Sequence, residues 1–181
     1  MMRRFLVALI CFLGAACGGS DAVEAPPSPT ALTDDAVGYY CGMTLSEHLG
    51  PKAQIFVEGG SKPFWFAQVR DAVQFIRSPE EIFHPVVFYV TDMSGAVDGD
   101  PPQPLNWIEA NAAWFVIDGN IAGGMGAPET IPFSSEGMAR NYAAQNGGRV
   151  LRLADIPDEY ILAPYEPMME EMKDMDHGAA N

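Results

Sequence analysis

Apolar runs in the first half of the chain predict strands arranged around one helix. Residues 53–58 and 64–66 have the apolar and aromatic composition of strands, and residues 86–91 form a β-branched and aromatic run typical of a buried strand. Between them, residues 69–76 carry apolar side chains at i, i+3, i+4 and i+7, which is the spacing of an amphipathic helix. The predicted order is therefore strand, strand, helix, strand.

The same order of elements recurs in the second half of the chain. Residues 113–117 and 130–133 are expected to form strands, and residues 149–153 a closing strand. Between the last two, a serine (Ser134 or Ser135) can cap a helix that ends at a Gly-Gly pair. The second unit thus also predicts strand, strand, helix, strand.

A repeated Pro-Phe pair supports an internal duplication, although few residues are identical between the two units. Pro63-Phe64 and Pro132-Phe133 each lie just before the helix of their unit. The second unit differs from the first by a glycine-rich insertion at residues 119–129, between its two strands. We therefore predict an α+β fold of two ββαβ modules.

The amino-terminal apolar run predicts export with a lipid anchor. Residues 5–16 follow two arginines and would form a helix about 18 Å long, short of the ~30 Å hydrocarbon core of a bilayer. The run ends in Leu-Gly-Ala-Ala-Cys, which resembles a bacterial lipobox and predicts lipidation of Cys17. Gly18 carries no inner-membrane retention signal, which favours an outer-membrane anchor facing the periplasm. Simple cleavage of a secreted protein is the alternative.

Composition changes divide the rest of the chain. Residues 21–35 are rich in Pro, Ala, Ser and acids without an apolar period, which predicts a disordered linker. The expected segments are a signal peptide at 1–16, a lipidated cysteine and linker at 17–36, a folded domain at 37–160 with modules at about 37–94 and 105–155, and a disordered, acidic and methionine-rich tail at 161–181.

Composition and charge exclude several classes of protein. Apolar residues make up 48% of the chain and charged residues 19%, so global disorder is excluded. The net charge of −14 repels polyanions and argues against nucleic-acid binding. Cys11 and Cys17 lie in the targeting segment, so Cys41 has no disulfide partner in the folded part. No Ser-His-Asp set or recognisable carboxylate pair predicts a hydrolase.

Cys41 and Met43 are the first candidate metal ligands. Their Cys-x-Met spacing allows a thiolate and a thioether to share one ion, with Gly42 permitting the backbone to bend. A small set of soft sulfur donors favours Cu(I), whereas zinc requires more Cys, His or carboxylate ligands. The alternative is a buried cysteine that serves only as a small apolar side chain.

Met125 is a candidate third ligand from the second module. It lies among three glycines and a proline in the run Gly-Gly-Met-Gly-Ala-Pro-Glu, where few side chains can pack against it. A phosphate-binding loop is excluded because no lysine or arginine and no phosphate-loop pattern accompanies these glycines. His48, seven residues after Cys41, is either an auxiliary ligand or a structural residue.

The tail carries a second set of candidate ligands. Met169, Met172 and Met175 recur every three residues and His177 follows them, among carboxylates that attract cations. This pattern predicts a weak second site for metal capture. An acidic tail that only increases solubility is the alternative.

These motifs together resemble the NosL family, the lipoprotein copper chaperones associated with nitrous oxide reductase maturation. The resemblance covers most of residues 37–155. It rests on Cys41-Gly42-Met43 followed by Leu45, His48 and Gly50-Pro51, on residues 107–115, and on Gly124-Met125-Gly126-Ala127-Pro128-Glu129 with Pro132-Phe133 downstream.

The resemblance has implications for fold, ligands and partners. It implies two ββαβ modules similar to the core of organomercurial lyase, and Cu(I) ligands at Cys41, Met43 and Met125. It also implies transfer of Cu(I), through the periplasmic protein of an ABC-type maturation complex, toward the copper-sulfur centre of nitrous oxide reductase. Lyase activity is not implied, because that chemistry needs two thiols and a carboxylate.

Three hypotheses for function follow. The leading one is a non-enzymatic metallochaperone that passes Cu(I) on by ligand exchange. The second is a membrane-anchored interaction lipoprotein with no metal in its fold, whose methionine-rich tail buffers copper. The third is a thiol enzyme with Cys41 as nucleophile, which the lack of a neighbouring base disfavours.

Overall fold

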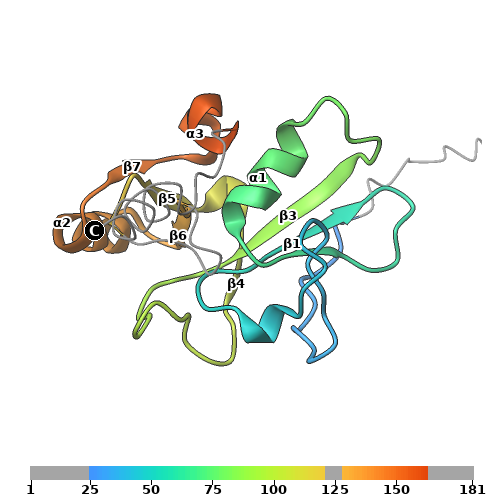
Figure 1. The fold of residues 1–181 in the computed structure, drawn as a ribbon, viewed down its shortest axis with the longest axis horizontal. Coiled ribbons are helices and arrows are strands. Elements are labelled where there is room, and N and C mark those ends of the chain that lie inside the picture. Colours follow the sequence, from blue (N-terminus) through green and yellow to red (C-terminus); the bar gives the residue numbers. More distant parts are fainter. Residues whose placement is uncertain (1–24, 121–127, 163–181) are drawn as a thin grey trace, which may run out of the picture.

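A computed structural model describes residues 25–120 and 128–162 as two antiparallel sheets that lie side by side, each with a helix packed against it (Figure 1). The first sheet has the strand order β2-β1-β3-β4. Its strands are β1 (Ala53–Val57), β2 (Phe64–Phe66), β3 (Pro85–Thr91) and β4 (Trp107–Glu109). Helix α1 (Val69–Arg77) follows β2 in the chain.

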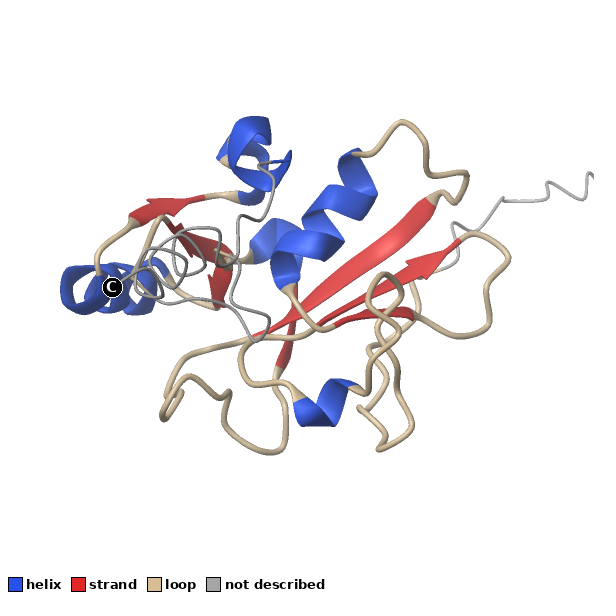
Figure 2. Cartoon of the chain, in the orientation of Figure 1, coloured by secondary structure: helices blue, strands red, loops and turns tan. Residues whose placement is uncertain are grey.

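The second sheet has the strand order β6-β5-β7 and is also antiparallel (Figure 2). Its elements are β5 (Trp114–Ile117), β6 (Ile131–Phe133), helix α2 (Glu136–Asn146) and β7 (Arg149–Leu151). Short helices stand between or after these elements, namely the 3-10 turns η1 (Leu45–Glu47), η2 (Ala110–Ala112) and η3 (Leu153–Asp155), and helix α3 (Asp158–Leu162).

The two sheets confirm the predicted α+β fold of two ββαβ units. In each unit the first strand is central, and the second and third strands flank it, which gives the equivalent orders β2-β1-β3 and β6-β5-β7. Strand β4 lies within the range expected for the second module, but it pairs with β3 at the edge of the first sheet.

The strand register corrects the predicted correspondence between the units. Phe66 pairs with Ala53 at the start of β1, and Phe133 pairs with Trp114 at the start of β5. Both phenylalanines are buried and precede their helix by three residues. Phe133 therefore corresponds to Phe66 and not to Phe64. Alternating side-chain directions put Phe64 and Phe66 on one face, so the sequence pattern could not distinguish them.

One apolar core joins the two units. It combines side chains of β1, β3 and α1 with side chains of β5, η3 and α3. Burying a large apolar side chain stabilises the fold by roughly 1.5–3 kcal/mol, so this shared core holds the modules together. The largest fully buried contributors are Ile55, Phe66, Val69, Val73, Phe75, Val90, Phe115, Ile117 and Ile161.

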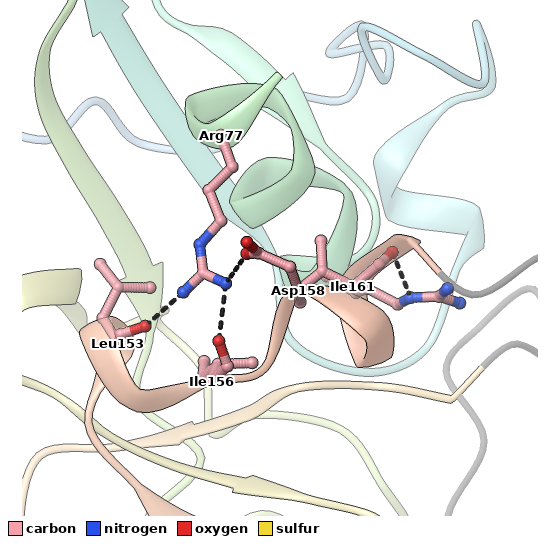
Figure 3. A network of polar contacts seen from close by, with 6 residues as sticks. Arg77, Leu153, Ile156, Asp158 and Ile161 are labelled. Carbon is pink, nitrogen blue, oxygen red and sulfur yellow. Dashed lines mark hydrogen bonds and ion pairs between the residues drawn. The ribbon is translucent and has the colours of Figure 1, made fainter. Parts of the chain in front are cut away.

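Arg77, the last residue of α1, connects this helix to the carboxyl end of the described chain. Its guanidinium donates to the carbonyl oxygens of Leu153 and Ile156 and to the Asp158 carboxylate, each at 2.7 Å. Figure 3 shows the three acceptors gathered around it. Since these acceptors belong to η3, the following residue and α3, Arg77 fixes α1 against the end of the second unit.

Residues 25–35 were expected to belong to a disordered linker, but in the structure this segment is held by hydrogen bonds to the first sheet. Thr30 donates its N–H to Oε1 of Gln54 at 2.8 Å and accepts from Nε2 at 3.0 Å. The Pro27 carbonyl oxygen accepts from the Tyr89 hydroxyl at 2.8 Å. Gln54 is fully buried on β1 and requires polar partners, which this segment provides. A linker-like composition gave no sign of these long-range contacts.

Individual residues confirm or correct the expectations for loops and strands. Met93 is buried and packs against the second sheet. Ser135 is the N-cap of α2, and its Oγ accepts from the Met138 N–H at 3.3 Å. Val86, expected to be buried, is 47% exposed because a bulge opposite Val57 leaves it unpaired. Across residues 25–120 and 128–162, no helix is both long and apolar enough to cross a bilayer.

Candidate functional site

Cys41 and Met43 lie at the tip of a tight loop that is closed at its base. Val37 and Thr44 form an antiparallel bridge across this base. Above it, the Gly38 N–H donates to the Met43 carbonyl oxygen at 2.9 Å. The two sulfur-bearing residues are therefore held in one turn, as the Cys-x-Met spacing predicted.

Two glycines permit this loop. Gly42 has φ of +64°, a left-handed conformation that side chains rarely adopt, and its N–H donates to the Gly38 carbonyl oxygen at 2.8 Å. A Cβ on Gly38 would collide with Sγ of Cys41, so the thiol lies directly over the Gly38 backbone. The bend at Gly42 was predicted. Gly38 was missed, and its only signal in the sequence is a glycine three residues before the cysteine.

The loop is attached to the outer strand of the first sheet. The Tyr39 N–H donates to the Trp65 carbonyl oxygen at 2.7 Å, and Gly38 forms a bridge with Trp65. The Tyr40 hydroxyl donates to the Glu81 carboxylate at 2.7 Å, and burial together with Glu81 raises the pKa of Tyr40 well above its ordinary value. Tyr40 therefore stays protonated and ties the loop to the segment after α1.

Neither of the two sulfur-bearing residues is buried in the core. Cys41 is a half-buried free thiol within the described part of the chain, and Met43 is 37% exposed. Gly38 and Gly42 line a surface groove of about 730 Å³ beside strand β2. An ion or a partner's ligand can therefore reach this loop from solvent.

Glu129, from the second unit, reaches the start of α1. One carboxylate oxygen accepts from the Arg70 N–H at 3.1 Å and from the Thr130 N–H at 2.7 Å. Gln68, the N-cap of α1, makes no capping hydrogen bond with its own side chain. The Tyr160 hydroxyl donates to the Glu129 carbonyl oxygen at 2.7 Å. Glu129 therefore supplies a cap that α1 lacks locally.

The Glu129 carboxyl group is only 3% exposed, and burial raises its pKa to about 8. The two backbone N–H donors oppose this rise, the nearby Asp71 carboxylate adds to it, and Lys52 opposes it. Its second oxygen, Oε2, has no hydrogen-bond partner in the structure. The role of Glu129 was not predicted. The only sign of it in the sequence is that this acidic residue ends the glycine-rich run.

Met125 lies in residues 121–127, outside the described residues. The ends of this run are described, however. The Asn120 N–H donates to the Asn146 carbonyl oxygen at 2.9 Å at the end of α2, and Glu129 caps α1. The two described ends of this run are therefore held at the end of α2 and at the first turn of α1, the helix that follows β2.

His48 lies in a different groove. This groove has a volume of about 570 Å³ and is lined by His48, Lys52, Asp100 and Trp107 together with Pro29 and residues 31–34. The Nε2 atom of His48 is buried without a hydrogen-bond partner. Lys52 is buried here and donates to the Gly50 carbonyl oxygen at 2.6 Å, and burial lowers its pKa to about 8. The auxiliary role of His48 stays a prediction.

The remaining candidates limit what kind of metal site is possible. Within the described part of the chain, no group of three or more His, Cys, Asp or Glu residues can hold a metal ion. The other predicted residues lie outside the described residues, namely Cys17, Met169, Met172, Met175 and His177.

Comparisons with known proteins place the chain in a family and agree with its fold. A sequence model of the NosL family matches residues 29–161. The copper-binding lipoprotein NosL of Achromobacter cycloclastes is 44% identical over 174 residues, which cover 96% of this chain and 89% of that protein. The protein of the same name from Stutzerimonas stutzeri is 29% identical over 173 residues, covering 96% and 85%.

A solved structure gives the same result. The crystal structure of the copper chaperone NosL from Shewanella denitrificans superposes with a TM-score of 0.65 at 28% identity, covering 73% of this chain and 97% of that one. The family match begins at residue 29, within the segment that packs against Gln54. By sequence and by fold, this chain belongs to the NosL family.

Proposed function

We propose that the protein is a non-enzymatic chaperone that carries one Cu(I) ion as cargo. The observation that carries this proposal is the Cys41-Gly42-Met43 loop, which presents a free thiol and a thioether together on an accessible surface. The relatives' names, copper-binding lipoprotein and copper chaperone, support the same conclusion.

The proposed ligands are Cys41, Met43 and Met125. A thiolate provides the negative charge, and two neutral thioethers complete a soft, low-coordinate site that suits Cu(I). Three ligands leave the ion open to an incoming thiolate or thioether, so transfer proceeds by ligand exchange without free Cu(I). Binding displaces the thiol proton, so the affinity should rise with pH.

The cellular role follows from the family resemblance. Lipidation of Cys17 would hold the domain at a membrane surface on the periplasmic side, which we propose to be that of the outer membrane. The recipient would be the periplasmic protein of an ABC-type maturation complex, and through it the copper-sulfur centre of nitrous oxide reductase. The net charge of −14 is consistent with a cation as cargo.

Titration with Cu(I) against a competing chelator tests the ligand set. Cys41→Ser should abolish tight binding, and Met43→Leu and Met125→Leu should each weaken it by about tenfold or more, equivalent to ~1.4 kcal/mol of binding free energy. Met138→Leu is the matched control, because Met138 on α2 is 39% exposed, close to the 37% of Met43. Unchanged affinity in all of the ligand variants would overturn the proposal.

Deletion of residues 166–181 tests the part played by the tail. If Met169, Met172, Met175 and His177 form only a weak second site, the truncated protein keeps one tightly bound Cu(I). Complete loss of tight binding would instead favour the interaction lipoprotein with a copper-buffering tail.

A further inference from the structure

We infer that Glu129 is a positioning residue for the copper site: from the second unit it caps α1 and thereby fixes the strand and loop that carry Cys41 and Met43. This inference rests on the function proposed above. It assigns Glu129 no contact with copper.

Glu129 caps the amino-terminal end of α1. The N–H groups of a helix's first turn have no acceptors within the helix and need acceptors from elsewhere. Gln68 provides no such acceptor at the start of α1, whereas Glu129 accepts from the Arg70 N–H at 3.1 Å. The two residues are 59 positions apart in sequence, so this helix is capped by the opposite module.

Aromatic contacts connect α1 to the copper loop. The Tyr39 ring packs against Phe66 of β2 and Phe75 of α1, with ring centroids 5.9 and 5.4 Å apart. The Tyr40 ring contacts the same two side chains, at 5.7 and 6.4 Å. These tyrosines directly precede Cys41, so a displacement of α1 is transmitted to the thiol through aromatic contacts.

The carboxyl group of Glu129 lies in a buried junction that contains several unpaired polar atoms. Among the residues that the structure describes, three buried polar atoms at this junction have no hydrogen-bond partner, namely Glu129 Oε2, Thr130 Oγ1 and Gln68 Nε2. Each unpaired buried polar atom costs free energy that an apolar junction would avoid. A junction that keeps these atoms despite the cost is typical of a functional position.

Charged and titratable groups face Glu129 from several elements. Arg70 and Asp71 belong to α1, Lys52 precedes β1, and Tyr160 belongs to α3. Burial outweighs the two backbone N–H donors and the attraction of Lys52, and it raises the pKa of Glu129 to about 8. The cap is therefore largely the neutral acid at pH 7, and an amide of the same shape can replace it as an acceptor.

Asp92 provides a matched comparison. It is also buried and also joins the modules, because its carboxylate accepts from the Ser134 N–H at 3.0 Å. It follows β3, however, which lies on the far side of β1 from β2. Loss of Asp92 therefore removes a contact between the modules without touching the support of the copper loop.

The experiment compares E129A, E129Q and D92A in the complete mature chain. Two properties are measured, the Cu(I) affinity against a competing chelator and the alkylation rate of Cys41 in the metal-free protein. Substitutions that act on a site through packed side chains change its coupling by factors of about 2 to 30, so E129A should bind Cu(I) several-fold more weakly. It should also change the alkylation rate. E129Q, whose amide oxygen still accepts from the Arg70 N–H, should restore both properties, and D92A should alter neither.

Affinity in E129A equal to that of the wild type, equal weakening by D92A, or no rescue by E129Q would each overturn the inference. If E129A does not fold, E129D, which withdraws the carboxyl by one methylene, is held to the same expectations. Failure of the proposed copper site is distinguishable, because C41S would then leave the Cu(I) affinity unchanged. The alkylation rate of metal-free protein tests Glu129 in either case.

Discussion

The thiol of Cys41 lies directly against the α-carbon of Gly38, where a Cβ would collide with Sγ. The same glycine donates its N–H to the Met43 carbonyl oxygen and accepts from the Gly42 N–H. The position of the thiol is therefore set by close approach to the backbone. A side chain at residue 38 would displace the sulfur while leaving the rest of the core untouched.

Gly38→Ala is expected to weaken Cu(I) binding by about tenfold, ~1.4 kcal/mol, because the added methyl group displaces Sγ from its position over the Gly38 backbone. Competition with a chelator measures this. Gly137→Ala is the control, since Gly137 lies in α2 with open space around its α-carbon, and alanine there should stabilise the helix by up to about 1 kcal/mol. Wild-type affinity in the Gly38 variant would show that the thiol is not held in this way.

Gln54→Leu is expected to release the segment before residue 37. The substitution removes both hydrogen bonds to Thr30, each of which contributes about 0.5–1.5 kcal/mol. Limited proteolysis should then cleave residues 27–36 faster than in the wild type. Gln145→Leu, at an exposed position on α2, should leave the cleavage rate unchanged. Equal protection in both variants would contradict the packing of this segment.

Arg77→Met is expected to loosen α1 from the end of the second unit. The substitution removes three hydrogen bonds, two of them to backbone carbonyl oxygens of η3 and of the residue after it. The free energy of unfolding should therefore fall by about 2–4 kcal/mol. Arg149→Met is the comparison, because its ion pair with Asp118 is exposed and should contribute under about 1 kcal/mol. Denaturant unfolding measures both, and similar losses would show that the Arg77 contacts do not join the units.

Glu129 gives the stability a specific pH dependence. Because folding raises its pKa from 4.5 to about 8, the folded state binds more protons between these values. The stability supplied by this group is therefore complete below about pH 4.5 and is lost as the pH rises through about 8. Compared with the wild type, E129Q should lose stability less steeply over this range, where one proton accounts for at most ~1.4 kcal/mol per pH unit.

Denaturant unfolding from pH 5 to pH 8 measures this difference in slope. Lys52, whose pKa burial lowers to about 8, loses its proton mainly above this range and adds little to the comparison. Parallel stability curves for the wild type and E129Q would mean that Glu129 does not change its protonation on folding.

Local patterns in the sequence predicted strands β1–β3 and β5–β7 and helices α1 and α2, but they did not predict contacts between distant residues. Apolar periodicity gave β2 and α1 within one residue, and Ser135 was one of two caps expected for α2. The Cys41-Met43 turn was predicted from its spacing and from Gly42. These features depend on neighbours within a few positions along the chain.

The missed features depend on contacts between distant residues. The partner of Gln54 is 24 positions away, and Glu129 caps a helix 59 positions away. Residue propensities and local spacing cannot predict which residues pair over such distances in the sequence. The correspondence of Phe66 with Phe133 was missed because a shift of two residues preserves the face of a strand.

The central claim is that sulfur atoms of Cys41, Met43 and Met125 hold a single Cu(I) ion. X-ray absorption on the anaerobically loaded domain, lacking residues 166–181, counts the ligand atoms directly. The account predicts three sulfur neighbours per copper, falling to two in Met125→Leu and in Met43→Leu. A first shell dominated by nitrogen or oxygen, or a sulfur count unchanged by both substitutions, would contradict it.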